Sequence, residues 1–202
     1  MRLSLRNICI VGITVSALIV INNLCKLFLP EFYATFIFSQ SGMSISSIII
    51  FIILAIHYIT LCFYLFKKQY VLAGIVWIIQ FLALIWYMNF IQSYNAFDPT
   101  SDYEQLFLNL KIKSFITIIT GSVFIFSLGR KHSWLAIFGF FLIVSTLPIF
   151  MPELVMFMKG FYFYIATLIP LFLIINYYLE LKNSDLSNGN NDHEMDVIDG
   201  DS

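Results

Sequence analysis

Long apolar segments separated by short polar ones form the dominant pattern of this sequence. A helix needs roughly 20 apolar residues to cross a bilayer core of about 30 Å, and six segments come close to that length. They lie at residues 8–29, 46–66, 70–91, 112–128, 134–150 and 157–178. Because hydrocarbon offers the backbone no hydrogen-bond partner, such segments fold as helices. The pattern predicts an all-α integral membrane protein, a polytopic bundle of about six transmembrane helices.

The composition agrees with this pattern and excludes a soluble domain. Hydrophobic residues make up 60% of the chain and charged residues only 11%, whereas soluble domains have about 25% charged residues. Of the 12 acidic residues, 7 lie at or beyond Glu180. The net charge of −1 provides no basic surface for nucleic acid. The expected partners are therefore the lipid bilayer and, as a further candidate, other membrane-protein subunits.

Basic residues mark one side of the predicted bundle. If six spans alternate, one side receives Arg2 and Arg6, Lys67 and Lys68, Arg130 and Lys131, and Lys182. Basic residues are enriched in cytoplasmic loops, so this side is predicted to be cytoplasmic. The sequence thus predicts a multi-pass protein of the cell membrane, a bacterial inner membrane or a plasma membrane, with both termini in the cytoplasm. No small-residue cleavage site follows the first apolar segment, which is therefore expected to be retained as a span.

Two segments outside the spans have a predicted structure of their own. Ser101-x-x-Glu104 has the form of a capping box and should start a helix near Asp102. The apolar residues that follow recur at helical spacing, which favours a short outer interfacial helix over a simple extension of the fourth span. After Leu181 the composition becomes acidic and polar. The sequence predicts a transmembrane domain at 1–182 and a disordered acidic tail at 183–202.

A short internal similarity allows two interpretations. Phe63-x-Leu65-x-Lys67-Lys68, followed by Leu72-Ala73, recurs 63 residues later as Phe126-x-Leu128-x-Arg130-Lys131, followed by Leu135-Ala136. One interpretation is a duplicated helical hairpin. The other is that cytoplasmic hairpins in general place basic residues between apolar runs, which needs no common origin.

The first span carries a stripe of small and polar residues, namely Gly12, Ser16, Asn23 and Lys26, with Asn22 one turn before Lys26. This face is expected to look inward, toward other helices. In a functional interpretation, Asn22, Asn23 and Lys26 line an outward-opening polar cavity that attracts an anionic group. In a structural interpretation, the stripe is a packing seam and Lys26 reaches the outer headgroups.

His57 and Gln80 are the polar side chains nearest the middle of the second and third spans. They lie at equal distances from the turn at Lys68 and Gln69, so they are expected at similar depth on neighbouring antiparallel helices. A hydrogen bond between them would satisfy both groups and contribute about 1 kcal/mol or less in a bilayer. The alternative is that His57 carries a proton or binds a ligand, since its side chain titrates near neutral pH.

Motifs for catalysis or metal binding are not found in the sequence. Between Glu31 and Glu180 every carboxylate falls in a predicted outer loop, which leaves the spans without an acidic general base. His57 has no second histidine at i+4, and the three cysteines are expected to be small buried hydrophobes. No catalytic residue, metal-ligand set or cofactor is predicted, and enzymatic activity is not favoured.

Three functions remain after these exclusions. The favoured one is a non-enzymatic accessory or assembly component of a membrane complex, which contacts its partner through packing seams. The first alternative is a small transporter or channel with a polar site near Asn23, Lys26 and His57. The second alternative is an intramembrane enzyme that acts on a lipid.

Overall fold

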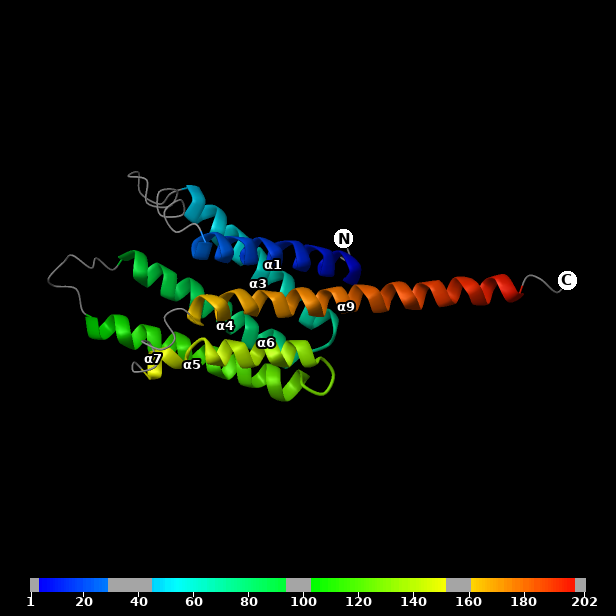
Figure 1. Cartoon of the computed structure of the whole chain (residues 1–202). Coiled ribbons are helices and arrows are strands. Elements are labelled where there is room, and N and C mark those ends of the chain that lie inside the picture. Colours follow the sequence, from blue (N-terminus) through cyan, green and yellow to red (C-terminus); the bar gives the residue numbers. More distant parts are fainter. Residues whose placement is uncertain (1–3, 29–44, 94–102, 152–160, 199–202) are drawn as a thin grey trace.

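The computed structural model describes residues 4–28, 45–93, 103–151 and 161–198, and the regular structure in these ranges is helical (Figure 1). The helices are α1 (Leu5–Phe28), α3 (Ile45–Lys67), α4 (Val71–Ser93), α5 (Tyr103–Leu128), α6 (Ser133–Val144), α7 (Leu147–Phe150) and α9 (Phe161–Ile198). Six helical segments are long and apolar enough to cross a membrane, with α6 and α7 together forming one of them. The six predicted spans are therefore confirmed as helices of spanning length.

Local sequence signals set several helix ends. Ser4 precedes α1, and its hydroxyl accepts a hydrogen bond from the Asn7 backbone N–H at 3.2 Å, as an N-cap does. The α3 helix ends in a turn in which Gln69 has a φ of 63°. The Tyr70 N–H there bonds to the Leu65 carbonyl, and the Gln69 N–H bonds to the Phe66 carbonyl. This is the Schellman pattern that closes a helix and reverses the chain.

The fifth span is broken between α6 and α7. Pro148 lies in the first turn of α7, where its missing N–H is tolerated. The hydroxyls of Ser145 and Thr146 each donate to a carbonyl of the last turn of α6, at 2.7 Å. The Ser145 bond provides a partner for the Leu142 carbonyl, because the Thr146 backbone N–H bonds to Ile143 instead.

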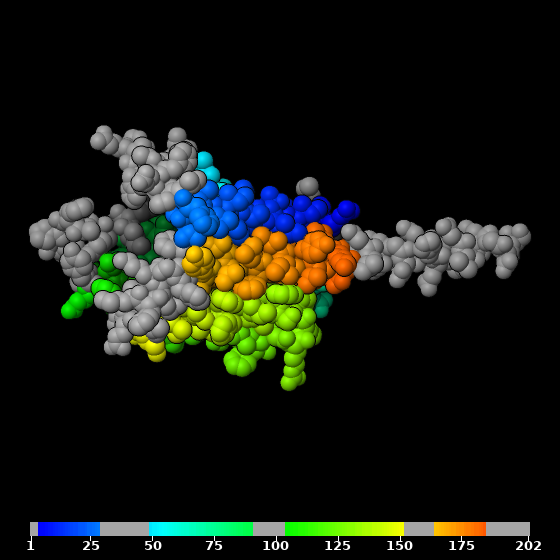
Figure 2. All heavy atoms as spheres, in the orientation of Figure 1, coloured from blue at the N-terminus to red at the C-terminus, as the bar shows by residue number. Residues whose placement is uncertain are grey.

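The helices form a closed ring in chain order. Along the chain, α1 contacts α3, α3 contacts α4, α4 contacts α5, α5 contacts α6, and α6 contacts α9. The ring closes because α9 also contacts α1, and Figure 2 shows these two helices side by side along the molecule. Each spanning helix thus has two neighbours and leaves one stripe to the outside.

Large aromatic side chains fill the interior of this ring. Trp77, Phe124 and Phe138 come from three successive helices, and their ring centroids lie 5.5 to 5.8 Å apart. All three side chains are almost completely buried. Fully buried leucines on α3, α5, α6 and α9 extend the same core. The centre of the ring is therefore packed with side chains.

The segments with the paired basic residues lie at one end of the bundle. Figure 1 shows the start of α1, the α3–α4 turn, the α5–α6 turn and the extension of α9 at the same end. We call this the basic end, defined by Arg6, Lys67, Lys68, Arg130, Lys131 and Lys182. The described basic pairs therefore lie at one end of the bundle, as the alternation of spans predicted.

Two expectations differ from the observed helices. The predicted separate interfacial helix is absent, because α5 runs unbroken from Tyr103 to Leu128 and residues 103–111 extend the fourth span. The start of α5 at Tyr103 agrees with the predicted start near Asp102, although Ser101 and Asp102 lie outside the described residues. Disorder after Asn183 is not confirmed, because α9 continues to Ile198. A helix already nucleated in a span can propagate into polar sequence, since each added residue gains a backbone hydrogen bond.

The internal similarity does not extend to the buried faces. Leu65 and Leu128 are both fully buried and occupy equivalent places in the two hairpins. The next helices differ, because Leu72 is 59% exposed and its counterpart Leu135 is fully buried. The two hairpins therefore present different faces of their second helices to the core, which favours the interpretation without a duplication.

The backbones of α5 and α6 approach each other closely at two glycines. A Cβ added at Gly121 would lie 2.5 Å from the Gly139 carbonyl oxygen, and one added at Gly139 would lie 2.7 Å from the Gly121 carbonyl oxygen. The two backbones thus meet directly, as at small-residue interfaces between membrane helices. The side-chain pattern did not indicate Gly139, because a glycine in an apolar run has no periodic signature.

This contact predicts that Gly121→Ala destabilises the protein, by about 1–3 kcal/mol, because the added methyl group meets backbone that cannot rotate away. Gly74→Ala is the matched control, since a Cβ there would meet only the end of the half-exposed Phe66 ring, at 2.9 Å. Thermal unfolding of the purified variants in detergent measures both effects. Equal losses in the two variants would contradict the close contact of α5 and α6.

Candidate functional site

His57 and Gln80, the two polar groups predicted to bond to each other, have partners on other helices. The His57 Nδ1 atom lies 3.3 Å from the Ser16 hydroxyl oxygen on α1. The Gln80 Nε2 atom donates to the Thr117 hydroxyl on α5 at 2.9 Å. Both side chains are buried. The predicted His57–Gln80 hydrogen bond is therefore wrong, whereas the expectation that both groups are bonded between helices holds.

The reason lies in the rotation of the helices. Equal distance from a turn places two residues at one depth, but it does not place them on the facing sides of the two helices. In the ring, the His57 side of α3 faces α1, and the Gln80 side of α4 faces α5. The α3–α4 contact at this level is made instead by Tyr58 and Trp77, whose rings stack at 4.5 Å.

Asn23 has a structural partner that involves the proline of α9. Pro170 lies inside α9 and has no N–H to donate, so the Ala166 carbonyl one turn earlier loses its helical hydrogen bond. The Asn23 Nδ2 atom donates to this Ala166 oxygen at 3.0 Å. The Asn23 side chain therefore replaces the hydrogen bond that Pro170 removes. This matters because a carbonyl without a partner costs free energy in a membrane.

The rest of the predicted α1 stripe also faces neighbouring helices. A Cβ at Gly12 would lie 2.5 Å from the Tyr177 ring of α9, so only glycine allows this approach. Asn22 and Lys26 are half-buried in the last two turns of α1, and each has an interaction partner. The stripe is an interface with α3 and α9 over most of its length.

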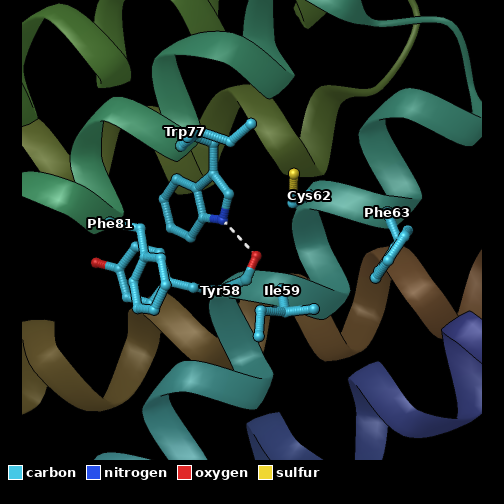
Figure 3. A pocket seen from close by; sticks show the side chains of 7 residues that line it. Tyr58, Ile59, Cys62, Phe63, Trp77 and Phe81 are labelled. Atoms are coloured by element: carbon cyan, nitrogen blue, oxygen red, sulfur yellow. Dashed lines mark hydrogen bonds between the residues drawn. The ribbon is translucent and has the colours of Figure 1, made fainter.

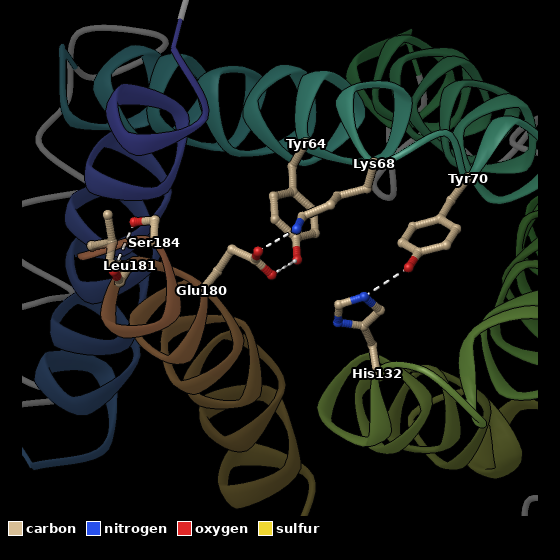
Figure 4. Close-up of polar contacts among 7 residues, drawn as sticks. All are labelled: Tyr64, Lys68, Tyr70, His132, Glu180, Leu181 and Ser184. Atoms are coloured by element: carbon tan, nitrogen blue, oxygen red, sulfur yellow. Dashed lines mark hydrogen bonds and ion pairs between the residues drawn. The ribbon is translucent and has the colours of Figure 1, made fainter. Parts of the chain in front are cut away.

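A polar cluster lies across the basic end of the ring (Figure 4). Lys68 forms an ion pair with Glu180, and the Tyr64 hydroxyl donates to the other Glu180 oxygen at 3.2 Å. The Lys68 and Glu180 side chains are 26% and 14% exposed. These bonds connect α3 with α9, which are separated by α1 in the ring. In the sequence, Glu180 lies just past the last predicted span and Lys68 belongs to a basic pair that indicates orientation. Neither position indicated that the two side chains meet.

A second bond at this end joins the two turns. The Tyr70 hydroxyl lies 2.7 Å from the His132 Nε2 atom, which connects the α3–α4 turn with the α5–α6 turn. Burial lowers the pKa of His132, opposed by Glu180 and reinforced by Lys68 and Lys131. Burial likewise raises the pKa of Tyr70. Both pKa shifts favour the neutral forms of the two side chains.

Two buried polar atoms near this cluster have no hydrogen-bond partner among the residues that the structure describes. They are the Asn176 Nδ2 and Tyr177 hydroxyl atoms on α9. The Tyr177 ring contacts the Tyr64 ring edge to face, with centroids 5.2 Å apart. Cys9, also fully buried, belongs to the same core. The cluster therefore combines satisfied and unsatisfied groups.

An apolar hollow of about 170 Å³ lies between α3 and α4. It is lined by Tyr58, Ile59, Cys62, Phe63, Trp77, Ile78 and Phe81, and Figure 3 shows the Trp77 indole donating to the Tyr58 carbonyl within it. Ile59 and Phe63 are about half exposed, so the hollow opens on the outside of the ring. In the ranges that the structure describes, no three His, Cys, Asp or Glu side chains gather as a metal site.

Comparison of the chain with models of known protein families, with curated proteins and with solved structures found no match. The interpretation of these contacts therefore depends on their chemistry alone.

The bond between Asn23 and Ala166 predicts a coupling between Asn23 and Pro170. Asn23→Leu should destabilise the protein by about 0.5–1.5 kcal/mol, because it leaves the Ala166 carbonyl without a partner. In a Pro170→Ala background the same change should cost much less, since the new backbone N–H bonds to that carbonyl. A double-mutant cycle by reversible unfolding measures this coupling. Strictly additive losses of stability would show that Asn23 does not compensate for the hydrogen bond that Pro170 removes.

Proposed function

We propose that this protein is a non-enzymatic component of a membrane complex, an accessory or assembly subunit that contributes a rigid helical ring. The proposal rests on the hydrogen-bond partners of Asn23, His57 and Gln80. Each of these intramembrane polar groups is hydrogen-bonded to a neighbouring helix. A polar side chain engaged in this way stabilises helix packing and requires no substrate.

The packed interior supports the same role. Trp77, Phe124 and Phe138 occupy the middle of the ring with their side chains almost completely buried. A conduit would require these rings to move together, since tightly packed cores do not deform by small steps. A static packing unit requires no such movement.

The outside of the ring is the surface available to a partner. It consists of exposed aliphatic and aromatic side chains on every spanning helix, which suit lipid or the apolar face of another membrane helix. The hollow between α3 and α4 would accept an apolar group of such a partner. We place the protein in the cell membrane with the basic end and both termini in the cytoplasm, in keeping with the positive-inside rule.

A small transporter or channel is the second candidate. Its support is the inward face of α1, on which Ser16 contacts His57 and Asn23 bonds to the Ala166 carbonyl one turn before Pro170. Broken helices surround substrate sites in many transporters. In this case His57 would carry a proton or a ligand, and its hydrogen bond to Ser16 would orient the imidazole group.

Substitution of His57 separates the two candidates. For a packing unit, His57→Gln should leave folding and cellular phenotype unchanged, because an amide can still bond to Ser16. His57→Leu should cost at most about 1–2 kcal/mol of stability, and its phenotype should follow the amount of folded protein. Cells that lack the native copy provide the phenotype, and detergent extraction with thermal unfolding provides the folded amount.

Gln80→Leu is the matched control, because it removes an equivalent interhelical bond on the other side of the ring. Under the proposal, His57→Leu and Gln80→Leu have phenotypes of the same size at equal folded amounts. A His57→Gln variant that folds normally and loses the phenotype would refute the packing role and favour transport, since glutamine does not titrate.

A further inference from the structure

Lys113 is a cation on the buried face of a spanning helix. It belongs to the apolar part of α5, between the buried residues Asn109 and Thr117. It lies about 15 residues from the end of α5 at Leu128, or roughly 22 Å at 1.5 Å per residue. If a hydrocarbon core of about 30 Å begins at Leu128, Lys113 falls in the third of it farthest from the basic end.

The Lys113 ammonium group lies beside an aromatic ring, and no described carboxylate pairs with it. Its Nζ atom lies 5.0 Å from the centre of the Tyr87 ring on α4. Among the residues that the structure describes, the ion pair formed is Lys68–Glu180, at the other end of the ring. A cation–π contact offsets only part of the cost of a charge in this environment. Within the described ranges, Lys113 therefore forms no ion pair.

Asn109 adds an unused polar group on the same face. It lies one helical turn from Lys113 and is 7% exposed. Within the described ranges, its side-chain amide takes part in none of the hydrogen bonds, although most buried polar groups do form one. Residues four apart share one side of a helix, so both donors lie on the same face of α5. One turn further along this face, Thr117 is bonded to Gln80 of α4.

We propose that Lys113 and Asn109 form a binding site for a phosphate-type oxyanion on the side of the membrane opposite the basic end. The ammonium group would supply charge and a hydrogen bond, the amide would supply a second hydrogen bond, and the Tyr87 ring would hold the lysine stem in place. The oxyanion is either the phosphate of an anionic lipid headgroup or a free phosphate ion. This site is independent of the packing role proposed above.

Lys111 is a matched control for the charge of Lys113. It lies two residues earlier on α5, carries the same charge and is exposed. Nonspecific attraction of anions to the surface would depend on Lys111 and Lys113 alike, whereas the proposed site depends on Lys113 alone. Lys113→Arg retains the charge and should retain binding, so it reports whether a loss in Lys113→Gln comes from charge or from misfolding.

The test measures lipid and phosphate binding by the full chain in an uncharged detergent. The probes are phosphatidylglycerol, phosphatidylcholine and inorganic phosphate, with chloride at equal ionic strength, and the readouts are native mass spectrometry and thermal stability. We expect phosphatidylglycerol to bind and stabilise the wild type and Lys111→Gln. Lys113→Gln should weaken binding by about tenfold, the loss of one charge-assisted hydrogen bond, and Asn109→Leu by a smaller factor.

The outcomes are distinguishable. Stabilisation by inorganic phosphate as well as phosphatidylglycerol identifies a free anion as a ligand, and stabilisation by phosphatidylglycerol alone identifies a headgroup. Equal losses in Lys111→Gln and Lys113→Gln would overturn the site and leave surface attraction. The absence of any effect of the three probes would also overturn it. Lys113 would then extend toward the headgroup region without binding a ligand.

Discussion

Hydrocarbon cannot accept or donate a hydrogen bond, and this constraint governs the arrangement of every polar group inside the ring. Its clearest consequence is the contact between α1 and α9, where Asn23 bonds to the carbonyl that Pro170 releases. The same constraint explains why the Ser16–His57 and Gln80–Thr117 contacts cross between helices. Apolar packing brings the helices together, and these bonds fix their rotation.

The sequence predicts the spans well because length and composition alone determine them, and it predicts the inward face of α1 because small and polar residues recur there at helical spacing. It could not predict which helix each polar group meets. His57 and Gln80 lie at equal distances from their turn, yet the rotation of α3 and α4 directs them to different neighbours. The Lys68–Glu180 pair was missed because its members are 112 residues apart and each had a simpler interpretation near a membrane surface.

Lysine side chains have different partners at the two ends of the helical ring. At the basic end, Glu180 neutralises Lys68, and the Tyr70–His132 bond ties the two turns together. At the opposite end, the described part of α5 places Lys113 beside an aromatic ring and away from any described carboxylate. Among the described residues, one cation at the basic end is thus paired with a carboxylate, and one cation at the opposite end lies against an aromatic ring.

Closure of the ring by α1 and α9 is tested most directly by a cysteine pair at Gly12→Cys and Tyr177→Cys, in a chain whose three native cysteines are replaced by alanine. The Tyr177 ring lies against Gly12, so a short thiol cross-linker should join the two positions within one chain rapidly and in high yield in the membrane. Gly12→Cys with Phe126→Cys is the control, because Phe126 is 87% exposed on the outside of α5. Efficient linkage of the first pair and little of the second is the predicted result. Equal linkage of both pairs, or linkage only between separate chains, would contradict the closed ring.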